Sequence, residues 1–99
     1  MSNVGRLIHR KRILKELTIK EVATRVDKSP GYVGDIEHGR LVGSPDVLRA
    51  IAVELSIDEQ RMQDAYLQDA TDNATRQWRE YRKRKREYRS QASDANATL

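Results

Sequence analysis

The segment that most constrains the fold of this chain is residues 17–39, which carry start and stop signals for two short helices. This segment reads LTIKEVATRVDKSPGYVGDIEHG. Thr18 and Glu21 have the spacing of a capping box, in which the threonine hydroxyl accepts the Glu21 amide and the carboxylate reaches back to the Thr18 amide. A helix is therefore predicted to begin here, and its inward apolar positions are Val22, Ala23 and Val26.

A second helix is predicted after a short polar break. Ser29 is a favoured N-cap residue, and Pro30 occupies the first helical position, where proline is tolerated. Val33 and Ile36 are three residues apart and form the inward side. Gly39 stands where a left-handed residue usually ends a helix. Two short helices joined by a tight turn are typical of a helix-turn-helix, whose second helix enters the DNA major groove.

The rest of the chain predicts only helices, because no segment shows strand-like alternation. An N-terminal helix begins near Val4, Leu7 and Ile8. Ser44 caps a later helix whose apolar face is Val47, Leu48, Ile51, Ala52 and Leu55. Asp58 caps another, with the buried candidates Met62, Ala65 and Tyr66. We predict an all-α domain of about five short helices that is complete near residue 68.

The composition fits one small domain with a polar extension. The chain has 99 residues, of which 37% are hydrophobic and 34% charged, and a core of this size does not support two independent domains. There is no cysteine, which excludes disulfides and cysteine-based zinc sites and suits a reducing compartment. His9 and His38 are far apart in sequence, so we expect both to be solvated and predict no metal site and no cofactor.

The apolar segments are too short for a membrane span or a signal peptide. The longest aliphatic run is residues 50–53, and no long apolar segment stands at the N-terminus. We therefore expect a soluble, cytoplasmic protein that has no membrane partner.

Positive charge is concentrated in the C-terminal part of the chain. The net charge is +4, and residues 1–60 carry ten Lys or Arg against nine Asp or Glu. Residues 76–89 alone carry eight basic residues against Glu80 and Glu87. A clustered basic segment favours a polyanionic partner, with nucleic acid first and an acidic membrane surface second.

Several motifs together resemble one family of DNA-binding domains. The pattern L-T-x-x-E-V-A occupies residues 17–23, and S-P-G-Y-V-G-D-I-E-H-G-R occupies residues 29–40. A helix led by Ser44 with Ile51 and Ala52 follows, and residues 55–57 read L-S-I. From about residue 7 to residue 62 the chain resembles the lambda-repressor-like, or Xre, helix-turn-helix family. The resemblance implies a five-helix DNA-binding domain, although a fold by itself does not decide function.

The resemblance also implies a structural ion pair. Arg12 lies four residues after Ile8 on the apolar stripe of the first helix, so it is expected to point inward. In this family such an arginine commonly pairs with a glutamate near the end of the recognition helix, which here is Glu37. The alternative is a surface pair of little energetic consequence.

The family's DNA contacts map onto the second helix of the motif and its surroundings. The resemblance implies DNA contacts by Thr18, Lys28, Ser29, Pro30, Gly31, Tyr32, Gly34, Asp35, His38 and Arg40. None of the expected base-edge positions 30, 31, 32, 34 and 35 is Arg, Gln or Asn, which are the residues that grip purines. Tyr32 is either a contact to DNA or a half-buried helix residue. Two glycines would let the helix sit close to the groove floor and read shape and methyl groups.

The C-terminal residues 69–92 predict a basic helix with an aromatic stripe. A 4,3 spacing places one set of residues on one face, which we expect to make oligomerisation or tail contacts: Leu67, Trp78, Tyr81 and Tyr88. The basic residues are candidates for contacts to the DNA backbone: Arg76, Arg79, Arg82, Lys83, Arg84, Lys85, Arg86 and Arg89. The helix serves as a dimerisation arm, as a DNA-backbone arm, or docks on its own domain. Residues 93–99 are predicted to be disordered.

The sequence thus predicts a DNA-binding transcriptional regulator, not an enzyme. The favoured interpretation is a repressor that binds double-stranded DNA as a homodimer, on a two-fold-related operator with half-sites about 10 bp apart. The alternative is an antitoxin-like or adaptor protein whose C-terminal aromatic helix binds a partner protein, with DNA binding secondary.

Overall fold

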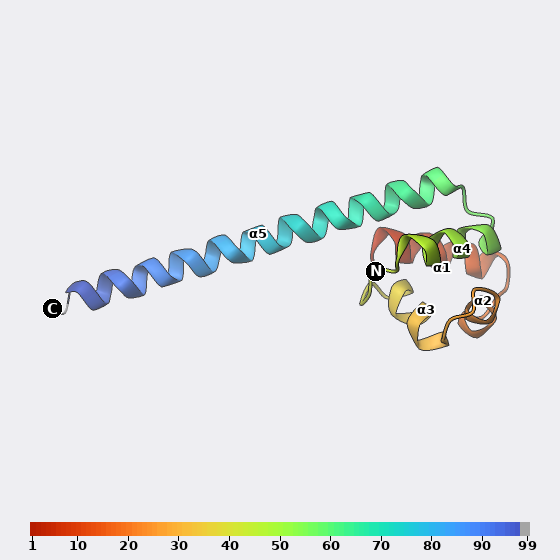
Figure 1. Cartoon of the computed structure of the whole chain (residues 1–99), viewed down its shortest axis with the longest axis horizontal. Coiled ribbons are helices and arrows are strands. Elements are labelled where there is room, and N and C mark those ends of the chain that lie inside the picture. The colour runs from red at the N-terminus through yellow and green to blue at the C-terminus, as the bar shows by residue number, and fades with distance from the viewer. Residues whose placement is uncertain (98–99) are drawn as a thin grey trace. The chain divides into compact units, whose positions relative to one another are not determined.

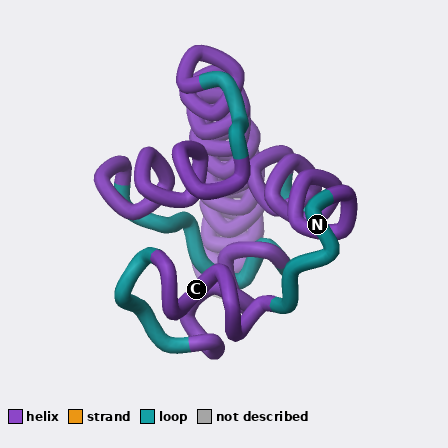
Figure 2. Tube along the Cα trace, turned by 90° about the vertical axis from the view of Figure 1, so that its right-hand side faces the viewer, coloured by secondary structure: helices purple, strands orange, loops and turns teal. Residues whose placement is uncertain are grey.

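The chain folds into α-helices joined by short loops. The computed structural model describes the backbone of residues 1–97 and the side chains of residues 1–85. Within these residues it contains no strand and five helices, α1 (Asn3–Leu14), α2 (Ile19–Arg25), α3 (Pro30–Glu37), α4 (Pro45–Leu55) and α5 (Glu59–Ala97) (Figures 1 and 2). The predicted all-α fold is confirmed. Along the described residues, no helix combines the length and the apolar character needed to cross a bilayer.

Every helix begins at a side chain that caps its first turn. The capping residues are Ser2, Thr18, Ser29, Ser44 and Asp58. At α2 the Glu21 amide donates to the Thr18 hydroxyl at 3.1 Å and the Thr18 amide donates to Glu21 Oε1 at 3.3 Å, which is the predicted capping box. Each cap satisfies an amide that has no partner inside the helix. The sequence analysis identified these caps except the one at Ser2.

Left-handed residues follow several of the helices. Gly39 has φ 77° after α3, as predicted from its position. Three other residues also adopt this conformation without being glycine, at φ 56° for Glu16 and Asp27 and 55° for Ser56. Side chains with a Cβ are disfavoured there, so the packing on both sides of these turns holds the backbone in place.

A single hydrophobic core lies among the first four helices and the start of α5. Helix α3 packs against α1 and α2, and α4 also packs against α1 and α2. The buried apolar residues come from all five helices and the loop before α5: Val4, Leu7, Ile8, Val22, Ala23, Val33, Ile36, Leu48, Ile51, Ala52, Leu55, Ile57 and Met62. This core fixes the position of α3 relative to the rest of the domain.

Helices α1 and α3 approach each other closely at Gly5. A Cβ atom on Gly5 would lie 2.2 Å from the carbonyl oxygen of Glu37, and this contact is with backbone. No side chain fits at this position without moving one of the two helices. Glycine is therefore required where the beginning of α1 meets the end of α3.

The chain divides into two compact units, Met1–Asp69 and Ala70–Leu99. Helix α5 is continuous across this boundary and extends to Ala97. It therefore includes residues 93–97, which the sequence analysis placed in a disordered tail. The predicted fifth helix of the domain and the predicted helix of residues 69–92 are thus parts of one helix. The reason is local, because the chain has neither glycine nor proline after Pro45. Residues 98–99 lie outside the described residues.

Asp69 ties the first unit together at the start of α1. Its Oδ1 accepts the Asn3 amide at 2.8 Å, and its Oδ2 accepts the Val4 amide at 2.9 Å. Together with the Ser2 cap, this carboxylate satisfies the amides of the first turn of α1 and places a negative charge at the helix N-terminus. It thereby links α5 to a helix at the other end of the domain's sequence.

Replacing Asp69 with Ala removes both acceptors, so we expect the free energy of unfolding to fall by about 1–2 kcal/mol. Urea unfolding followed by far-ultraviolet circular dichroism measures this change. The matched control is Asp64→Ala, because Asp64 is exposed on the same helix and accepts a hydrogen bond from Gln60, one turn earlier. Its change should stay within about 0.5 kcal/mol. Equal losses in the two variants would contradict a special role for Asp69.

Candidate nucleic-acid interface

Helix α3 has a buried face and an exposed stripe. Val33, Ile36 and Glu37 are buried, with 0%, 1% and 1% of their surface exposed. Residues at the spacing of three and four on the opposite side are exposed or half-exposed, and they are Gly31, Gly34, Asp35 and His38. We call these four residues the outer stripe. The helix is thus anchored by one side and presents the other to solvent.

The two larger side chains of the outer stripe interact with their own segment. His38 Nδ1 donates to the carbonyl oxygen of Gly34, one turn earlier, at 2.8 Å. The carboxylate of Asp35 lies 3.5 Å from the guanidinium of Arg40, which follows the helix. Both contacts are at the surface.

The two glycines of the outer stripe have open space around them. A Cβ atom on Gly31 or on Gly34 would meet nothing within 4 Å, apart from the helix's own nearby backbone. In a helix interior glycine is less stable than alanine by about 0.8–1.0 kcal/mol, which applies to Gly34, and the cost is smaller at Gly31 in the first turn. Packing within the domain therefore does not require glycine at either position, unlike Gly5.

The other predicted DNA-contacting residues differ in how far their side chains are held by contacts within the domain. The Thr18 hydroxyl is part of the capping box with Glu21. Ser29 Oγ accepts the Tyr32 amide at 3.1 Å, and the Tyr32 ring is half-buried against the core. Lys28 and Pro30 are exposed, as is Arg40. Lys28, Ser29, Pro30, Tyr32 and Arg40 thus lie in α3 and its two flanking turns, whereas Thr18 stands at the start of α2. The contacts of all these residues to DNA stay predictions.

A buried carboxylate joins the end of α3 to α1. The two oxygens of Glu37 accept from Arg12, with Nε 3.0 Å from Oε2 and Nη2 2.7 Å from Oε1. Arg12 also donates from Nη1 to the carbonyl oxygen of Leu17 at 2.9 Å. The Arg12 side chain is 12% exposed and that of Glu37 is 1% exposed. The pair implied by the family resemblance is therefore present, with bidentate geometry and little water around it.

His9 is a member of this cluster that the sequence analysis missed. Its Nδ1 forms a hydrogen bond with Glu37 Oε1. The expectation of a merely solvated His9 is therefore wrong. The signal was its position three residues before Arg12, because this spacing places both side chains on one face of α1. Among the described residues, no three His, Cys, Asp or Glu side chains form a group that could hold a metal ion.

The environment of the pair keeps both partners charged. Burial raises the pKa of the Glu37 carboxyl, because the charged form loses its water. Hydrogen bonds from Arg12 and His9, together with their charges, have the larger combined effect and hold the pKa of Glu37 below its ordinary value. The hydrogen bond to Glu37 raises the pKa of Arg12 despite its partial burial.

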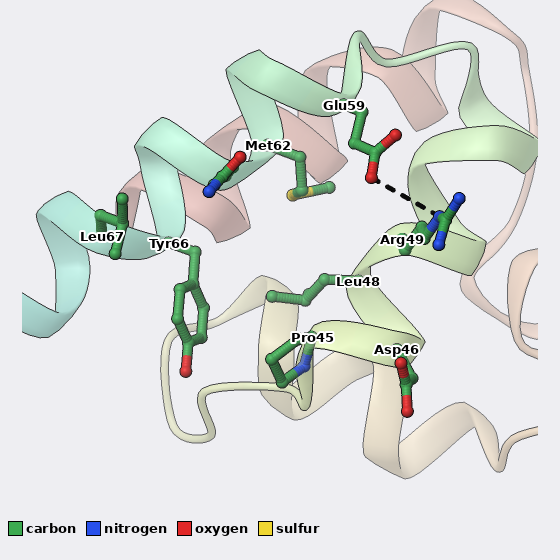
Figure 3. Close-up of a pocket in the computed structure, with 9 residues that line it drawn as sticks. Pro45, Asp46, Leu48, Arg49, Glu59, Met62, Tyr66 and Leu67 are labelled. Carbon is green, nitrogen blue, oxygen red and sulfur yellow. Dashed lines mark ion pairs between the residues drawn. The ribbon is translucent and has the colours of Figure 1, made fainter.

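A pocket of about 360 Å³ lies between α4 and the beginning of α5, away from α3 (Figure 3). Its floor includes Leu48 and Met62, and an ion pair of 3.5 Å between Arg49 and Glu59 crosses its rim. The residues that line it are Pro45, Asp46, Leu48, Arg49, Glu59, Met62, Gln63, Tyr66 and Leu67. Of these, the sequence analysis singled out Leu67 as a contact residue.

The second unit carries an exposed aromatic pair on a basic helix. Trp78 and Tyr81 are 62% and 52% exposed, and their rings meet edge to face with centroids 5.6 Å apart. The basic side chains described in this unit are all exposed: Arg76, Arg79, Arg82, Lys83, Arg84 and Lys85. Glu80 lies 3.8 Å from Arg84. The predicted contacts of Arg86, Tyr88 and Arg89 fall outside the residues whose side chains are described.

The helical core and the two-helix motif α2–α3 place the domain in the helix-turn-helix class. Residues 8–61 match the helix-turn-helix family, which is more than half of the chain. The chain belongs to the lambda-repressor-like, or Xre, helix-turn-helix family of DNA-binding regulators.

The chain is also similar to yeast proteins named multiprotein-bridging factor 1. Those of Debaryomyces hansenii and Candida albicans are each 39% identical over 57 residues, and that of Candida glabrata is 36% identical over 58 residues. The similarity covers 54% of this chain and 38% of each relative, so the chain spans well under half the length of these proteins. No solved structure matches the chain significantly.

We expect Arg12→Ala to lower the free energy of unfolding by about 3–5 kcal/mol, because it leaves the buried Glu37 carboxylate without its bidentate partner. Thermal and urea unfolding measure the loss. The control is Arg10→Ala, which removes an exposed arginine from the same helix and should change the free energy of unfolding by less than about 0.5 kcal/mol. A free energy of unfolding equal to that of wild type in Arg12→Ala would show that the pair does not stabilise the fold.

Acid should destabilise the domain through Glu37. Because the folded-state pKa lies below the ordinary value of 4.5, the contribution of this group is present above pH 4.5 and is lost as the pH falls through the lowered pKa. We expect Glu37→Gln to reduce stability at neutral pH and to flatten the acid limb of a plot of unfolding free energy against pH. Glu54→Gln, at a half-exposed carboxylate, should retain that limb. Identical acid limbs in wild type and Glu37→Gln would contradict this assignment.

Proposed function

We propose that this protein is a sequence-specific transcriptional repressor that occupies a promoter as a homodimer, with each domain reading one half of a two-fold-related operator. The observation that carries the proposal is the exposed outer stripe of α3 on a helix whose other face is anchored in the core. A recognition helix must present one face to the groove while the rest of the domain holds its orientation. A role in binding rather than catalysis, and a cytoplasmic location, are parts of this proposal.

The dimer is supported by the size of the domain and by the aromatic pair of α5. One domain of this size reads one half-site, so pairing two domains multiplies both affinity and specificity. Trp78 and Tyr81 expose aromatic surface that a second copy would cover. The basic residues on the same helix, such as Arg79 and Lys83, would add contacts to phosphates and make binding depend steeply on salt.

A second candidate function is that of an adaptor or antitoxin-like protein in which the C-terminal helix binds a partner protein and DNA binding is secondary. The name of the yeast relatives describes proteins that bridge several proteins. The exposed Trp78 and Tyr81 are suitable residues for a protein interface, because aromatic side chains are enriched in such interfaces.

Selection of DNA from a randomised duplex library by the full chain tests the main proposal. We expect the selected sequences to share an inverted repeat with half-site centres about 10 bp apart, and titration should show tight binding to them compared with shuffled duplexes. Light scattering should report twice the chain mass of 11.4 kDa. Equal binding to every duplex would exclude sequence-specific recognition.

Two sets of substitutions in the full chain separate the roles of α5. The double variant Trp78→Ala and Tyr81→Ala should yield the monomer mass and lose operator affinity if the helix is a dimerisation arm. The triple variant Arg79→Gln, Arg82→Gln and Lys83→Gln should retain the dimer and reduce the salt slope by about three for each chain, or about six for the dimer, if these residues contact phosphates. A monomeric wild-type chain with no operator preference would favour the adaptor.

A further inference from the structure

The outer stripe of α3 has no side chain over its first turn and the start of its second. Gly31 and Gly34 occupy this surface, and additional atoms would meet open space at both positions. The nearby polar side chains are tied to the helix or to its end, with His38 bonded to the Gly34 carbonyl oxygen and Asp35 beside Arg40. Glycine is used where a backbone must come close to another molecule, and nothing within the domain fills that role here.

The dimensions of a helix and of the major groove make this bare surface significant. A helix with its side chains is about 10–12 Å across, whereas its Cα atoms lie only about 2.3 Å from its axis. The major groove is about 12 Å wide and about 8.5 Å deep, so an ordinary helix fills it and contacts base edges through its side chains. At Gly31 and Gly34 the base edges can instead reach the helix backbone itself.

The chemistry of the glycine surface selects among the base edges. The exposed groups at these positions are Cα methylenes, which neither donate nor accept a conventional hydrogen bond. Guanine, adenine and cytosine present polar groups in the major groove, whereas thymine adds a C5 methyl group. An apolar surface pairs favourably with a methyl group and leaves the polar edges of the other bases without partners.

We propose that Gly31 and Gly34 are specificity-determining residues that pack directly against thymine methyl groups in the major groove. This inference rests on the proposed recognition of an operator by α3 and specifies how the helix reads it. If the glycines had no contact with DNA, alanine at either position would stabilise the helix and leave DNA binding unchanged. Opposite effects on folding and on binding therefore distinguish a contact surface from two tolerated glycines.

The test compares Gly31→Ala and Gly34→Ala with wild type on the operator selected by the wild-type full chain. Gly34→Ala should melt about 4–8 °C higher, because alanine favours the helix interior, and Gly31→Ala should gain less because residue 31 lies in the first turn. Both should also bind the operator about tenfold more weakly or worse, as for a mismatched base pair, because the added methyl group separates the helix from the bases.

The matched control is Val53→Ala, which strengthens a helix at a site remote from the outer stripe. Val53 is 73% exposed on α4, and alanine is the better helix former. This variant should also melt higher, yet it should bind the operator as tightly as wild type. It thereby separates a general effect of greater stability from the effect of filling the glycine surface.

Deoxyuridine in place of thymidine tests the chemistry, because it removes the C5 methyl group and keeps every hydrogen-bonding group. We expect wild-type binding to weaken about fourfold for each contacted thymine replaced. Wild-type affinity in both glycine variants, or full affinity for the deoxyuridine operator, would overturn the glycine contact while the repressor proposal stands. Failure of the wild-type chain to select any sequence would overturn the proposed function and this inference together.

Discussion

The interaction on which the rest of this structure depends is the buried carboxylate of Glu37. Glu37 stands at the last turn of α3, and its carboxylate binds Arg12 and His9 of α1. The backbone carbonyl oxygen of Glu37 lies against Gly5. A buried charge without partners is strongly unfavourable, so Glu37 favours the arrangement in which both Arg12 and His9 bind its carboxylate. Because α1 is part of the core, this arrangement also sets the direction in which α3 faces.

The core and the carboxylate cluster have complementary roles in presenting α3. Apolar packing through Val33 and Ile36 holds the helix against the domain, but apolar contacts alone tolerate small rotations. The bidentate contact between Arg12 and Glu37 has a defined geometry and removes that freedom. A rigidly held helix can use a bare surface for recognition, since the glycines of the outer stripe would be of little use on a helix of variable orientation.

The parts of the fold that are set by residues close together in the sequence were predictable. Two helix starts could be predicted from Thr18 with Glu21 and from Ser29 before Pro30, because a cap joins residues that are three apart in the sequence. The Arg12 to Glu37 pair was implied by family resemblance, whereas the hydrogen bond of His9 to the same carboxylate spans 28 residues and was missed. The link from Asp69 to α1 spans more than 60 residues and has no local signature. The continuous α5 was locally predictable, since the segment lacks helix breakers.

The sequence by itself determined where helices begin, which faces are apolar and which family the domain resembles, because capping, periodicity and short motifs are local properties. Only the tertiary structure decided which glycines are required by packing. Gly5 is confined by the backbone of Glu37, whereas Gly31 and Gly34 face open space. The three residues are alike in the sequence, and their difference arises from what the folded chain places beside each of them.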